Sequence, residues 1–125
     1  MLYTEGNLRA EDRALRHIAH GKVNFALSQI ETKTVYLVER LVQKVDAQAS
    51  RNFTAEQLLD WVRNHESLQS EHALINRYTD AFPELEERVA QKRHHILRTA
   101  LTRIQEAVTP FEYQRRFAHT KGLHH

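Results

Sequence analysis

The chain has 125 residues, of which 41% are hydrophobic and 27% are charged, and its formal net charge is +2 at pH 7. This composition is too apolar for a disordered chain and fits one soluble domain with a modest core. The chain contains no cysteine, which excludes disulfide bonds, zinc–thiolate sites and thiol catalysis. No apolar run approaches the roughly 18 residues of a membrane span, and no secretion signal is recognisable. We therefore expect a cytoplasmic protein that does not enter a membrane.

Residues that favour turns are few. Only 3 glycines and 2 prolines are present, which predicts helices joined by short connections rather than many strands. A first helix is predicted from residue 7 to about residue 20, because apolar residues there fall roughly on one side. Gly21 either ends this helix or lies inside a longer one, at a cost of about 1 kcal/mol relative to alanine.

An apolar stripe with near-heptad spacing predicts a long helix over about 22–49. Such a stripe has two interpretations. It packs against the other helices of the same chain, or it pairs with a second copy and makes the protein a homodimer. In the second case the dimer interface consists of Val23, Leu27, Ile30, Leu37, Leu41 and Val45.

The clearest boundary follows this helix. Thr54 and Gln57 have the spacing of a capping box, and Phe53 is placed to pack on Leu58 as a hydrophobic staple. A helix from Ala55 to about residue 65 is expected to bury Leu58, Leu59, Trp61 and Val62. After a break at residues 66–69, a second helix must end before Pro83, which completes a short helical hairpin over about 55–81.

Pro83 suits the first position of a second long helix, which its apolar stripe extends to about residue 108. Thr109, Pro110 and Glu112 have the pattern of another capping box. We therefore expect a new short helix to about residue 118 that returns Phe111 and Phe117 to the bundle. Residues 119–125 are expected to form a flexible tail, and its final two histidines match a purification-tag remnant.

A nucleic-acid surface is one interpretation of the polar residues. The hairpin resembles a helix-turn-helix in outline, and asparagine and arginine can read base edges. Against this, Glu71 and Asp80 would repel phosphate, and lysine or arginine side chains also commonly cover a solvated helix face. The residues assigned to this surface are His72, Asn76, Arg77, Lys92, Arg93, Arg98 and Arg103.

Residues with catalytic or metal-binding chemistry do not form a complete motif. His17 and His20 could share a metal by their spacing, but no carboxylate between them completes a zinc-binding pattern. Arginine–histidine spacings resemble those of HEPN-type RNases at Arg13 to His20 and at Arg88 to His94 or His95. The polar residue that usually follows the arginine is missing, so we expect no catalytic residues, no metal and no cofactor.

These patterns predict an all-α, single-domain bundle of five or six helices over residues 1–118. The function expected first is that of a small non-catalytic interaction or regulatory protein that binds a macromolecular partner, as a homodimer. A nucleic-acid-binding regulator of the helix-turn-helix type is the alternative, and a HEPN-like RNase is a third. No motif is specific enough to assign a family.

Overall fold

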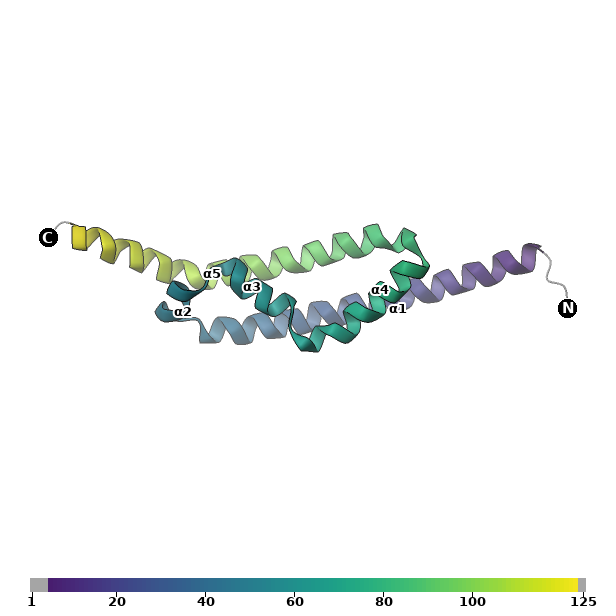
Figure 1. The fold of residues 1–125 in the computed structure, drawn as a ribbon, viewed down its shortest axis with the longest axis horizontal. Helices are drawn as coiled ribbons and strands as arrows, with labels where there is room; N and C mark the ends of the chain where they lie inside the picture. Colours follow the sequence, from purple (N-terminus) through teal and green to yellow (C-terminus); the bar gives the residue numbers. More distant parts are fainter. Residues whose placement is uncertain (1–4, 124–125) are drawn as a thin grey trace.

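The computed structural model describes the backbone of residues 5–123 and the side chains of residues 10–112. Within this range the chain is helical apart from short connections, which confirms the all-α prediction (Figure 1). The elements in chain order are α1 (Glu5–Lys44), α2 (Ala47–Asn52), α3 (Ala55–Arg63), the 3-10 turn η1 (Glu66–Leu68), α4 (Gln69–Ala81), the 3-10 turn η2 (Pro83–Leu85) and α5 (Glu86–Leu123).

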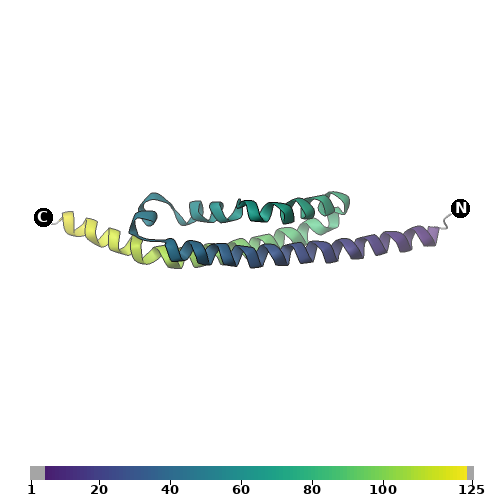
Figure 2. The ribbon, with the colours of Figure 1, turned by 90° about the horizontal axis from the view of Figure 1, so that it is seen from below.

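The two long helices, α1 and α5, run parallel to each other. Side-chain contacts join Asn24 to Arg88 and Glu39 to Arg103, so the pairing advances in the same direction along both helices. The segment from α2 to α4 returns the chain along one side of this pair (Figure 2). The bundle is elongated because α1 and α5 overlap only in part, and their free ends project from opposite ends of it (Figure 1).

The core consists of two adjoining apolar clusters. One contains Val23, Leu27 and Ile30 of α1 packed with residues of α4 and α5, and the other contains Leu37 and Val38 packed with residues of α3 and α5. The stripe that suggested a dimer interface therefore packs within one chain, because Val23, Leu27, Ile30 and Leu37 are buried there and Leu41 and Val45 pack at the edge.

The helix predicted over 22–49 has different ends in the structure. At the first end, Gly21 lies inside α1, which is the second of the two alternatives for this residue, and a Cβ added there would meet no atom within 4 Å. At the other end, Asp46 begins a new short helix by accepting a hydrogen bond from the backbone N–H of Ala49 at 2.8 Å. An aspartate in this role satisfies a free N–H group at the helix start, and α1 ends at Lys44, about five residues before the predicted end at residue 49.

The hairpin prediction is mostly confirmed. Thr54 caps α3 and forms the full capping box with Gln57, with N···O distances of 3.1 and 2.8 Å. A 3-10 turn fills the predicted break, and α4 ends at Ala81 before the proline. The burial of Trp61 was predicted wrongly, because 52% of it is exposed, and Phe53 is half exposed as well.

The predicted boundary at Thr109 is also wrong, because α5 continues through Pro110 to Leu123. Thr109 donates its hydroxyl hydrogen bond to the carbonyl of Gln105 at 2.6 Å, one turn back in the same helix, instead of capping a new one. Among the described side chains of α5, Val108 is the last buried one, and α5 changes direction beyond it (Figure 1). The predicted tail is helical up to Leu123, and Phe117 lies outside the described side chains.

Candidate interaction surfaces

A ladder of polar contacts joins the exposed edges of α1 and α5. Arg88 donates to Asn24 at 2.9 Å, Lys92 to Glu31 at 2.9 Å, and Arg103 donates two hydrogen bonds to Glu39 at 2.9 and 3.2 Å. The partners are 64, 61 and 64 residues apart in sequence. Exposed ion pairs contribute only about 0–1 kcal/mol each. Because the sequence offset between the partners is nearly constant, these contacts set the axial register of the two helices. They contribute less to the stability of the fold.

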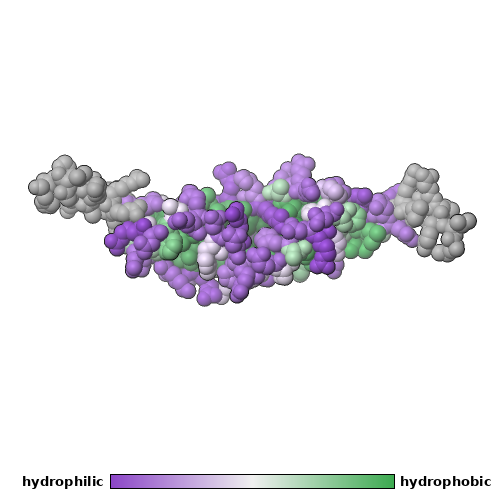
Figure 3. Space-filling model, in the orientation of Figure 1, coloured by the Kyte–Doolittle hydropathy of each residue, from purple (hydrophilic) through white to green (hydrophobic). Residues whose placement is uncertain are grey.

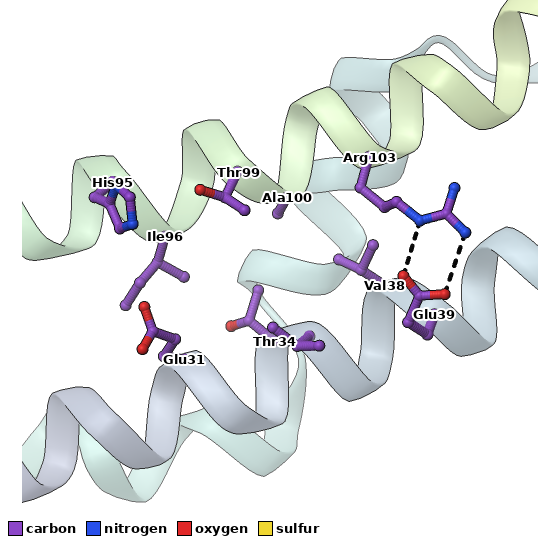
Figure 4. A pocket seen from close by; sticks show the side chains of 10 residues that line it. Glu31, Thr34, Val38, Glu39, His95, Ile96, Thr99, Ala100 and Arg103 are labelled. Carbon is purple, nitrogen blue, oxygen red and sulfur yellow. Dashed lines mark hydrogen bonds and ion pairs between the residues drawn. The ribbon is translucent and has the colours of Figure 1, made fainter.

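A groove of about 240 Å³ interrupts this ladder between Glu31 and the Glu39–Arg103 pair (Figure 4). Its floor is made of the buried residues Val38, Ile96 and Ala100, and its lining comes from α1 and α5 alone. The groove is smaller than the roughly 300–1,000 Å³ of sites for drug-sized ligands. Its size therefore suits one large apolar side chain rather than a nucleotide-sized cofactor.

Apolar side chains also lie on the face of α1 that points away from the core. Phe25 is 67% exposed, Val35 is 53% exposed and Tyr36 is 61% exposed. On the face shown in Figure 3, small apolar patches are scattered among mostly hydrophilic side chains. A second stripe with steps of three and four follows this face, and we call it the outward seam: Ile18, Gly21, Phe25, Ser28, Thr32 and Val35.

The outward seam is poor in free polar groups. Thr32 donates its hydroxyl hydrogen bond to the carbonyl of Ser28 at 3.1 Å, so its polar atom is satisfied within α1. The seam ends beside the groove, because Val35 belongs to both. The outward seam and the groove therefore form one continuous surface.

Arg93 and His72 form a separate polar contact between α5 and α4. Arg93 donates from Nη2 to Nδ1 of His72 at 3.1 Å, and both residues are partly buried. Burial, and then the charge of Arg93, lower the pKa of His72 below its ordinary value, and burial lowers the pKa of Arg93. The Nε atom of Arg93 is buried without a hydrogen-bond partner, so this cation is incompletely compensated.

The carboxylate of Glu71, the residue next to His72 in α4, has the opposite environment. Lys33 of α1 donates to Glu71 at 2.6 Å and to the carbonyl of Ser67 at 3.0 Å. Burial alone would raise the pKa of Glu71, but hydrogen bonds from Lys33, the backbone and Ser70 lower it below the ordinary value. Glu71 is therefore held as a carboxylate that ties α4 to α1.

The residues assigned to a nucleic-acid surface are not brought together on one face. His72 and Arg93 face each other, and Lys92 and Arg103 are paired with carboxylates of α1. Asn76, Arg77 and Arg98 are exposed, the first two on α4 and the last on α5. The sequence did not reveal Glu31 and Glu39 as partners, because a contact between residues 61 or more apart leaves no local spacing to recognise.

The histidines considered as metal ligands are His17 and His20. His17 and His20 are both exposed on α1, and no group of three histidine, aspartate or glutamate side chains that could hold a metal occurs among the described residues. Over the same part of the chain, no helix is long and apolar enough to cross a membrane.

Comparison of the chain with protein-family models, curated proteins and solved structures finds no match. The function therefore has to be inferred from the chain's own surfaces.

Proposed function

We propose that this protein is a non-catalytic interaction protein that acts as a homodimer, with the outward seam of α1 as its contact surface. The observation that carries the proposal is the exposure of Phe25 and Val35 in the seam, and of Tyr36 next to it, on a helix whose opposite face is packed in the core. Exposed apolar groups in a continuous patch mark interaction sites more often than scattered ones do. Aromatic side chains are also the commonest anchors of protein interfaces.

The polar groups next to the seam support binding rather than chemistry. The side chains of Glu31 and Glu39 are held in pairs with α5, so they keep the groove open to a fixed width. A shaped apolar depression with a polar rim is the usual anatomy of a protein interface.

The solution mass tests this proposal. One chain has a mass of 14.7 kDa, and light scattering should give about twice this value for the wild type. Phe25→Asp should reduce the mass to that of one chain, because it places a charge in the seam. Trp61→Asp is the matched control, since Trp61 is an exposed aromatic residue on α3 outside the seam, and it should leave the mass unchanged. A wild type that stays monomeric up to high concentration would remove the proposal.

A nucleic-acid-binding regulator is the alternative, and it rests on the exposure of Asn76, Arg77 and Arg98. A binder that uses several phosphate contacts loses affinity steeply as salt rises. A gel shift with duplex DNA in a salt series should show such a loss for this alternative, and the double variant Arg77→Ala, Arg98→Ala should weaken binding. If no complex forms at low salt, the alternative is removed and the homodimer proposal is unaffected.

A further inference from the structure

Four residues of the outward seam are placed symmetrically about position 30 of α1. Phe25 and Val35 lie five residues to either side of this position, and Ser28 and Thr32 lie two to either side. Continuing outward, Gly21 is matched by Glu39. A two-fold axis through position 30 would therefore pair two antiparallel copies of α1 with each residue opposite its counterpart.

We infer that two copies of the chain pair through α1 in an antiparallel orientation, with Phe25 of each copy seated in the α1–α5 groove of the other, beside Val35. This inference rests on the proposed homodimer and specifies its geometry. Among the described side chains, Phe25 is the most exposed large apolar residue, at 67%. The groove of about 240 Å³ has room for such a ring and is lined by apolar side chains at its floor.

The groove and the aromatic residue are on the same molecule, which explains why the fitting partner is a second copy. Phe25 and Val35 are ten residues apart on one straight helix, so about 15 Å separates them along its axis. In an antiparallel pair, each Phe25 would reach the other copy's groove at the same time. The contact is therefore isologous and closes with two copies.

Gly21 gains a role in this arrangement. A glycine inside an exposed helix costs about 1 kcal/mol, and nothing in the chain itself lies near its missing Cβ. In the antiparallel pair the bare backbone at Gly21 faces Glu39 of the other copy. The neighbouring Lys22, which has no ion-pair partner among the described side chains, brings a positive charge close to that carboxylate.

A parallel pair would lack these advantages. Phe25 would meet Phe25, both grooves would stay empty, and Glu39 would lie opposite Glu39. Like charges placed opposite each other across an interface disfavour binding. The antiparallel orientation is therefore the one that both the shape and the charge of α1 favour.

Disulfide cross-linking can test the orientation, because the chain has no cysteine of its own. Gly21→Cys mixed with Glu39→Cys should give a cross-linked dimer under mild oxidation, and each variant alone should not. In the antiparallel pair two copies of position 21 lie about 27 Å apart along the axis, far beyond the roughly 7 Å limit for Cα atoms of a disulfide. Glu39→Cys removes the contact with Arg103, and Ser28→Cys mixed with Thr32→Cys would keep that contact. Two copies of position 28 lie only about 6 Å apart along the axis, so this second pair tests contact through the seam and not its orientation.

A bulky side chain placed in the groove tests whether Phe25 of the other copy binds there. Thr99→Trp, at the exposed rim of the groove, should weaken dimerisation at least about tenfold, as loss of an interface anchor does. Thr102→Trp, one turn further along α5 and outside the groove, should leave it unchanged.

The possible results separate the inference from the proposal on which it rests. A monomeric wild type would overturn both. A dimer in which Gly21→Cys and Glu39→Cys each cross-link with themselves would overturn the antiparallel orientation and leave the homodimer standing. A dimer insensitive to Thr99→Trp would overturn the seating of Phe25 in the groove.

Discussion

Arg93 shows how a single residue can work against the stability of a bundle. Its guanidinium group is partly buried between α4 and α5, and the only described hydrogen bond that it makes is to the ring of His72. A buried charge without an opposite charge is costly. The neutral imidazole of His72 accepts this hydrogen bond, so the contact between the two side chains depends on the protonation state of the histidine.

We expect the protein to lose stability as the pH falls through the titration of His72. The pKa of His72 is lower in the folded chain than its ordinary value of 6.5, so the unfolded chain binds the proton more readily. The free energy of unfolding should therefore start to fall below about pH 7 and level off below the lowered pKa.

Urea denaturation between pH 8 and pH 5 would measure this effect. His72→Gln should flatten the pH dependence, and Arg93→Met should flatten it in part, because the positive charge of Arg93 is the second cause of the shift after burial. A wild type and a His72→Gln variant with the same pH slope would contradict the expectation.

Gly21→Ala should stabilise the folded chain by about 1 kcal/mol, since alanine favours helix over glycine by that amount and the added Cβ meets open space. Chemical denaturation should compare the Gly21→Ala, Phe25→Asp double variant with Phe25→Asp alone. This comparison separates the effect on the helix from any effect on dimerisation. A loss of stability in that background would indicate that the glycine is required within a single chain.

At the scale of helices, two sequences with the same capping pattern have different structures. Thr54→Ala should cost about 1 kcal/mol, because it removes the acceptor for the N–H of Gln57 at the start of α3. Thr109→Ala should cost much less, because Thr109 lies within α5 and bonds only to its own preceding turn. Urea denaturation of the two variants would compare them, and equal losses would mean that Thr109 has a capping role after all.

The difference between these two sites shows what could be predicted from the sequence. The capping box at Thr54 was predicted correctly because the apolar helical pattern is interrupted on both sides of this site. Phe53 precedes it and the hairpin follows it. At Thr109 the proline and threonine suggested a boundary, yet the helix continues, and Val108 is the last buried residue among the described side chains, which end at residue 112. A proline then interrupts only the hydrogen bonding of a helix that is already leaving the bundle.

Packing partners far apart in sequence explain the remaining errors. The apolar stripe of α1 was recognised, but its spacing could not show whether α5 or a second copy covers it. Trp61 was predicted to be buried because tryptophan usually is, although it lies on the outer side of α3. The groove was not anticipated, because its walls come from two helices that are joined only by tertiary contacts.

For the molecule as a whole, the two faces of α1 should respond differently to the same substitution. Leu37 lies in the core, so Leu37→Asp buries a charge and should destabilise the fold by on the order of 3 kcal/mol or more. Phe25→Asp lies on the outward seam and should leave the helical content intact while it dissociates the dimer. Circular dichroism with light scattering would record both effects, and retention of full helicity in Leu37→Asp would place the core elsewhere.

The parallel pairing of α1 with α5 also has a consequence for how the chain acquires its structure during synthesis. The contacts between the two helices join residues 61 to 64 positions apart, so most of α1 has left the ribosome well before its partner exists. At roughly 5–20 residues per second, the apolar stripe of α1 waits about 3–13 s for α5. Until then it is open to water and to other nascent chains, and the segment from α2 to α4 is the first part of the protein able to cover it.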